Sequence, residues 1–208
     1  YKFDIGGSAL MKMKYMYYII GLIVVVIVAV VLFLASPWTG PEERRAKFYD
    51  KGMALYEKGD NVRARLEFKN AIQIDPKYAM AYYMLGEIEL KDQAMQNAYS
   101  YFTKAIELQP DLVNARVGLG KLYLAANDKE KLKESVGLIL AAEPKNIEGL
   151  LLKASLLIME KDNAEAEKEL KGIIAMDPER QDSYLLLARL YKNQDRDTEA
   201  ADVLKGFI

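Results

Sequence analysis

The sequence of 208 residues carries 29 lysines and arginines against 30 aspartates and glutamates, so it lacks the basic excess that nucleic-acid binding requires. It has no cysteine, which excludes disulfides and thiolate metal ligands, and no histidine, the commonest general base. We therefore expect no metal, no cofactor, no nucleic-acid partner and no enzymatic activity.

The chain begins with a short N-terminal tail, residues 1–14, to which we assign no fold. Its first residue is tyrosine rather than methionine. Met11 would serve as an initiator, and residues 1–10 would then be upstream sequence.

Residues 15–35 contain no charged side chain. A helix of this length would be roughly 31 Å long, about the thickness of the hydrocarbon core of a bilayer. Only a helix satisfies the backbone of a single apolar segment in lipid. Tyr17 and Tyr18 lie at one end and Trp38 lies beyond the other, as in the aromatic belts at the two membrane interfaces. The segment is therefore predicted to be a transmembrane anchor.

A cleaved signal peptide is the alternative interpretation of the same segment, with Lys12 and Lys14 as its basic start. The apolar run is longer than such peptides usually have, and Pro37 follows the small residues, which favours a retained anchor. The two lysines favour a cytoplasmic N-terminus. We expect a single-pass protein of the bacterial inner membrane. Residues 36–41 form a short linker, and residues 42–208 after it are expected on the periplasmic side.

Residues 42–208 repeat with a period of 34. The period is marked by Pro76, Pro110, Pro144 and Pro178. With each proline at position 32 of a unit, the units lie near 45–78, 79–112, 113–146, 147–180 and 181–208. The proline ends a helix, because it lacks an N–H group and disfavours helix in the residue before it.

Small residues recur at two positions of this unit. Position 8 holds Gly52, Gly86, Gly120, Ala154 and Ala188, and position 20 holds Ala64, Ala98, Leu132, Ala166 and Ala200. Such residues let two antiparallel helices approach closely, and bulky residues between them fill the remaining space. One helix pair cannot bury its apolar face alone, so neighbouring pairs must stack. Gly118-Leu-Gly120 follows no strand, so we interpret these glycines as packing residues rather than as a nucleotide-binding loop.

This pattern resembles the tetratricopeptide repeat family over residues 42–208. The resemblance implies an all-α fold, an α-solenoid of antiparallel helix pairs with about five units, the last of them incomplete. One transmembrane helix is expected to precede it.

The family resemblance also implies a concave groove lined by positions 5, 9 and 12 of each unit. The predicted partner-binding residues are Tyr49, Met53, Tyr56, Tyr83, Glu87, Leu90, Val117, Lys121, Leu124, Leu151, Ser155 and Ile158, and in the last unit Leu185, Arg189 and Lys192. The alternative is that some of these side chains belong to the core. The family's clamp for acidic tails uses lysine and asparagine, whereas Tyr49, Met53 and Met84 stand here. An amphipathic helix or an apolar peptide is therefore the expected ligand.

Three functions remain open at the level of sequence. The first is a membrane-tethered module that scaffolds or assists the assembly of a membrane or envelope complex through other proteins. The second is a chaperone-like or quality-control factor that holds clients at the lipid bilayer. The third is a structural subunit that self-associates through an uncapped last repeat.

Overall fold

The computed structural model describes residues 6–35 and 40–206, which form eleven α-helices in this part of the chain. The chain divides at Gly40 into two compact units. The first contains helix α1, Gly6–Ala35. This helix begins within the segment to which the sequence assigned no fold.

The side chains of residues 16–28, 30 and 31 in α1 are exposed, and those of Tyr17 and Tyr18 are among them. Trp38 and most of the linker lie outside the described residues. Among the residues that the structure describes, no helix combines the length and the apolarity needed to cross a membrane. The membrane role of residues 15–35 thus stays a prediction.

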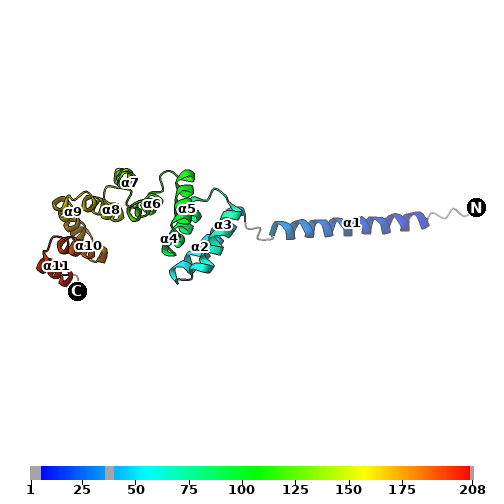
Figure 1. The fold of residues 1–208 in the computed structure, drawn as a ribbon. Helices are drawn as coiled ribbons and strands as arrows, with labels where there is room; N and C mark the ends of the chain where they lie inside the picture. Colours follow the sequence, from blue (N-terminus) through cyan, green and yellow to red (C-terminus); the bar gives the residue numbers. More distant parts are fainter. Residues whose placement is uncertain (1–5, 36–39, 207–208) are drawn as a thin grey trace, which may run out of the picture. The chain divides into compact units, whose positions relative to one another are not determined.

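The second unit is a row of five helical hairpins (Figure 1). They are α2 (Pro41–Glu57) with α3 (Asn61–Ile74), α4 (Ala79–Lys91) with α5 (Met95–Leu108), α6 (Val113–Ala125) with α7 (Lys129–Ala142), α8 (Ile147–Met159) with α9 (Asn163–Met176), and α10 (Gln181–Lys192) with α11 (Asp197–Lys205). Each helix contacts the next along the chain, and α6 also contacts α4 and α8. The all-α solenoid predicted from the sequence is confirmed.

The ends of the helices follow the period of the sequence. The second helices of the first four hairpins end at Ile74, Leu108, Ala142 and Met176, each two residues before the periodic proline. At the start of α3, the side chain of Asp60 accepts a hydrogen bond from the backbone N–H of Arg63 at 3.1 Å. Asp128 and Asp162 cap α7 and α9 in the same way. These caps satisfy donors that a helix N-terminus otherwise leaves free.

The small residues at position 8 are required by the neighbouring helix. A Cβ atom on Gly52 would lie 2.7 Å from the ring of Phe68, and one on Gly86 would lie 2.5 Å from the ring of Phe102. Both phenylalanines are fully buried. Gly118 lies against the same Phe102 ring, and Gly120 lies against Leu152, so both glycines of the Gly-Leu-Gly sequence are packing residues.

The core runs through the array as a series of clusters between successive hairpins rather than as one central mass. Position 20 is fully buried in the first four hairpins, at Ala64, Ala98, Leu132 and Ala166. Each hairpin thus buries its apolar surface against its neighbours, as expected of a repeat array. The first helices α4, α6 and α8 are thereby placed side by side, since α6 contacts both of the others.

Candidate partner-binding groove

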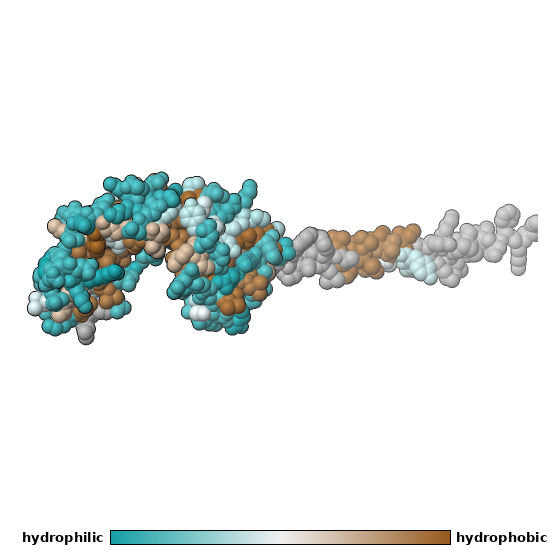
Figure 2. All heavy atoms as spheres, in the orientation of Figure 1, coloured by the Kyte–Doolittle hydropathy of each residue, from teal (hydrophilic) through white to brown (hydrophobic). Residues whose placement is uncertain are grey.

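Two adjoining pockets lie along the first helices of the last three hairpins. One has a volume of about 390 Å³ and is lined by Leu124, Asn127, Ser155, Ile158, Met159, Leu186, Arg189, Leu190 and Asn193. The other has a volume of about 340 Å³ and is lined by Lys121, Leu124, Glu148, Leu151, Leu152, Ser155, Asp182, Leu185, Leu186 and Arg189. Figure 2 shows a hollow in the array between its first two hairpins and its last two.

The structure therefore brings together most of the predicted groove residues of α6, α8 and α10, but Val117 and Lys192 line neither pocket. Lys121, Leu124, Leu151, Ser155 and Ile158 all line one or both pockets. Leu185 is 49% exposed at the edge of the second pocket, so its side chain is available to a ligand. We call these two pockets together the C-terminal groove.

The predicted groove residues of α2 and α4 lie in a different environment, because most of them pack against the core of the first two hairpins. The ring of Tyr49 lies 5.5 Å from that of Phe68 and 5.2 Å from that of Tyr78. Burial raises the pKa of the Tyr49 hydroxyl to about 12. Tyr83 packs against the Phe102 ring at 6.2 Å, and burial raises its pKa as well. For these tyrosines the alternative of a core role is the better description.

The other predicted residues of this half are partly buried. Met53 and Tyr56 pack on the buried cluster that contains Phe68, and Leu90 packs on the buried cluster that contains Phe102. The ammonium group of Lys91 lies 3.9 Å from the centre of the Tyr56 ring, which is a favourable cation–π geometry. Val117 is only 5% exposed and belongs to the core around α7 and α8, because its α6 position faces the neighbouring helices.

A cluster of charges lies at the second pocket of the C-terminal groove, which Lys121 and Glu148 line. Lys121 lies 3.0 Å from Glu148, and Arg180 donates a hydrogen bond to the same carboxylate. Burial opposes ionisation of Glu148, but the hydrogen bonds from Lys121 and Arg180 outweigh it and lower its pKa. Burial raises the pKa of the nearby Glu87 carboxyl, and this effect outweighs the positive charge of Lys121, which lowers the pKa.

Arg189 lines both pockets of the C-terminal groove, and its exposed guanidinium forms no ion pair among the described residues. Sequence reasoning missed Glu148, Arg180 and Leu186, and also the asparagines Asn127 and Asn193. Glu148 stands at position 2 of its unit, which the family pattern places at the groove margin. The others lie in turns or at positions that carry no periodic signal.

The lining of the groove is suited to binding a ligand with apolar side chains. Its apolar lining consists of leucine, isoleucine and methionine side chains, and amide, hydroxyl and charged groups complete the lining. Such a surface can bury apolar side chains of a ligand and orient them by a few polar contacts. Over the described ranges, no three acidic side chains are grouped so as to hold a metal ion.

The fold is an α-solenoid with two adjoining pockets along the first helices of its last three hairpins. A family model for the TPR repeat matches residues 52–93, and two models for the tetratricopeptide repeat match residues 79–112 and 157–206. The helical array of this chain therefore contains tetratricopeptide repeats. Within residues 41–208, the matches leave 41–51, 113–156 and 207–208 uncovered.

Solved structures with the same fold support this assignment. The thermophilic TPR protein TTC0263 of Thermus thermophilus is 19% identical, with a TM-score of 0.69 over 78% of this chain and 89% of that chain. The type IV pilus biogenesis factor PilW is 20% identical, with a TM-score of 0.70 over 78% of this chain and 76% of its own. PilF of Pseudomonas aeruginosa is 16% identical, with a TM-score of 0.68 over 81% of this chain and 77% of its own. At identities this low the likeness shows the fold alone. No curated protein sequence matches the chain significantly.

Proposed function

We propose that this chain is a non-catalytic interaction module that binds an apolar segment of another protein in the C-terminal groove. The observation that carries the proposal is the pair of adjoining pockets with an apolar floor between α6, α8 and α10. An exposed apolar surface that is rimmed by polar groups marks an interaction site. An amphipathic helix suits it, because such a helix presents apolar side chains along one face.

We further propose that the module is tethered to a membrane through residues 15–35 and assists the assembly of a larger envelope complex. The uncharged sequence of this segment and the exposed apolar side chains of α1 support the tether. The assembly role is supported by the likeness in fold to PilW, a type IV pilus biogenesis factor.

The groove is tested by comparing two exposed leucines. Leu185 lies at the edge of the C-terminal groove, whereas Leu66 on α3 is 57% exposed and lines neither of the two groove pockets. Partners captured by the full chain from detergent extracts should be lost with Leu185→Glu and retained with Leu66→Glu. Equal recovery by both variants would refute the groove as the binding site. Many weakly bound clients, rather than one stoichiometric partner, would indicate a holding function instead.

The tether is tested by cysteine labelling. Each introduced cysteine is labelled specifically, because the chain has no cysteine of its own. A membrane-impermeant maleimide should label Ser100→Cys in the array of intact spheroplasts, whereas Met13→Cys, which lies before the apolar segment with either start, should react only after lysis. The opposite pattern would place the array in the cytoplasm. Release of the full chain from membranes at alkaline pH would contradict the tether itself.

A further inference from the structure

Positions 18 and 22 of each unit lie one turn apart on the second helix, and all of the side chains at these positions are exposed. In the last four units they are Gln96 and Ser100, Glu130 and Glu134, Ala164 and Lys168, and Thr198 and Asp202. The first unit differs, because α3 places Val62 and Leu66 there, 75% and 57% exposed. Within the described part of the array, these are the two most exposed large apolar side chains. The repeat pattern does not account for this apolar pair.

The charged side chains on the exposed side of α3 are basic. Besides the apolar pair, the exposed residues of this helix are Arg63, Lys69 and Gln73. Arg63 pairs with Asp60, yet its side chain is 72% exposed. Lys69 forms no ion pair with any residue that the structure describes. The acidic residue of α3, Glu67, is buried and lies 2.6 Å from Lys51. The solvent side of α3 thus combines two apolar and two basic side chains without a carboxylate.

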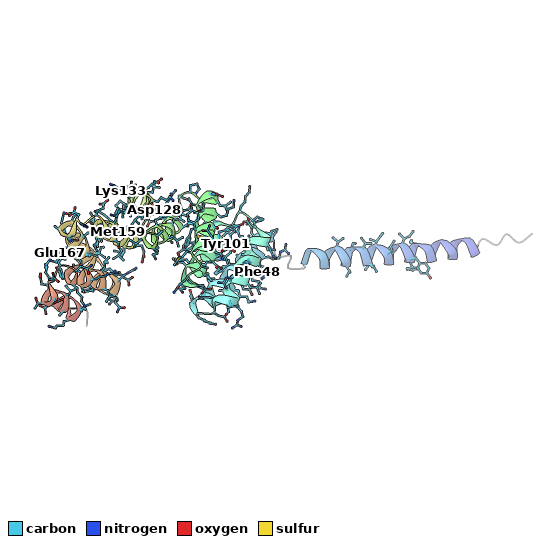
Figure 3. The ribbon with its side chains drawn as sticks, in the orientation of Figure 1. Phe48, Tyr101, Asp128, Lys133, Met159 and Glu167 are labelled. Atoms are coloured by element: carbon cyan, nitrogen blue, oxygen red, sulfur yellow. The ribbon has the colours of Figure 1, made fainter. Side chains whose placement is uncertain are left out.

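The basic excess is also larger on α3 than on the other second helices. It carries three basic residues against one acidic residue, whereas α7 carries three against two and α5 carries one of each. Acidic residues outnumber basic ones on α9 and α11. Glu167, labelled in Figure 3, is one of the three glutamates of α9, and it neutralises Lys171 at 2.7 Å. The exposed apolar pair and the largest basic excess therefore coincide on one helix.

This helix belongs to the hairpin that directly follows the apolar segment in the sequence. Five residues, 36–40, separate Ala35 at the end of α1 from Pro41 at the start of α2. A chain of that length reaches roughly 20 Å at most. With residues 15–35 in a membrane, as proposed above, the first hairpin is confined to the neighbourhood of the membrane surface. A bilayer is thus the surface that the chain itself brings within reach of α3.

We propose that the exposed side of α3 is a second membrane contact that lies on an anionic lipid surface. Val62 and Leu66 enter the boundary between headgroups and acyl chains, and Arg63 and Lys69 face the lipid phosphates. Helices with this division of side chains lie in the interfacial plane of anionic bilayers. The negative surface potential of such a bilayer complements the basic residues. The inference rests on the proposed tether, because a few side chains bind lipid only weakly and stable anchoring needs a second signal.

Quenching of a fluorophore by lipid tests the contact. Because the chain has no cysteine, Gln73→Cys and Glu107→Cys can each carry one nitrobenzoxadiazole label. Both residues are exposed at position 29 of their units, on α3 and α5, so they form a matched pair. A third label at Val24→Cys reports on the apolar segment itself. The full chain is reconstituted into vesicles of phosphatidylcholine and phosphatidylglycerol that contain a lipid with a nitroxide on its acyl chain.

We expect the label at position 73 to be quenched at least about twofold more strongly than the label at position 107, since α3 alone reaches the acyl chains. Val62→Ser combined with Leu66→Ser should lower the quenching at 73 to the level at 107. Leu138→Ser combined with Met176→Ser removes exposed apolar side chains from α7 and α9, and it should leave the quenching unchanged. Vesicles of phosphatidylcholine alone should give weaker quenching at 73, because they lack the negative surface charge.

The label at position 24 distinguishes a failure of this contact from a failure of the tether. Quenching at 24 together with equal quenching at 73 and 107 would overturn the α3 contact and leave the tether in place. No quenching at 24 would refute the tether, and the α3 contact with it. An unchanged signal at 73 in the double serine variant with native helicity, or in neutral vesicles, would also overturn the proposal. So would a discrete protein crosslinked to position 66, since a protein would then cover this face.

Discussion

Single residues in the turns carry the same conformation in all five hairpins. Position 15 has a positive φ each time, from 56° at Asn127 to 77° at Gly59. Only the first hairpin has glycine there, although a side chain in this region costs roughly 1–2 kcal/mol. The turn geometry is therefore imposed by the packing of the two helices, and glycine is not needed to produce it.

The helix caps give a prediction at the same scale. Ala94 has the backbone angles of the capping residue Asp60 but no side chain that can accept a hydrogen bond. Ala94→Asp should therefore raise the free energy of unfolding by about 1 kcal/mol. Urea denaturation measures it, with Asp162→Ala as the reverse change at an existing cap. A lower stability of Ala94→Asp would show that the start of α5 is satisfied in another way.

At the scale of a helix pair, the approach of α4 to α5 rests on Gly86. A Cβ there would overlap the buried Phe102 ring, so Gly86→Ala should destabilise the array by about 1–3 kcal/mol. Gly137 on α7 is the matched control, since a Cβ would meet nothing within 4 Å. Gly137→Ala should stabilise the array by roughly 0.5–1 kcal/mol, as expected in an exposed helix. Thermal melts that show equal effects for both would contradict the packing described here.

The junction of the fourth and fifth hairpins should depend on pH. Hydrogen bonds from Arg196 and then Lys171 lower the pKa of Glu167 from 4.5 to about 2. Because the folded-state pKa is depressed, this contribution to stability is complete above the unfolded value and is lost as the pH falls toward 2. Wild type should lose more stability than Glu167→Gln between these two values in urea titrations. Parallel pH profiles of the two proteins would contradict the ion network.

Several features of the fold could be predicted from the sequence because they repeat at a fixed spacing. The prolines at position 32 and the small residues at position 8 predicted the helix ends and the close helix contacts. The groove was harder to predict, because an apolar side chain at a groove position can face either the ligand or the core. Tyr49 and Tyr83 turn inward against phenylalanine rings, whereas Leu185 stays exposed.

Contacts between units were not predictable in the same way. The charge cluster of Lys121, Glu148 and Arg180 joins residues of different units, and its members carry no common periodic signature. The contact of Tyr99 with Tyr123 likewise joins side chains of two successive units. Such features depend on how successive hairpins are stacked.

At the scale of the whole molecule, the array presents two surfaces of different chemistry. The C-terminal groove combines apolar side chains with the exposed residue Arg189, whereas the pocket beside Tyr99 and Tyr123 is lined by aromatic, apolar and charged side chains. Of the two, the C-terminal groove carries the proposed function.

Photo-crosslinking in living cells tests that function most directly. A photoreactive phenylalanine analogue is placed at Leu185 in the groove or at Leu66 on the outer face of the first hairpin, both of which are exposed. We predict one discrete crosslinked partner from position 185 and none from position 66. Discrete crosslinks from position 66 alone would contradict a partner-binding groove at α6, α8 and α10.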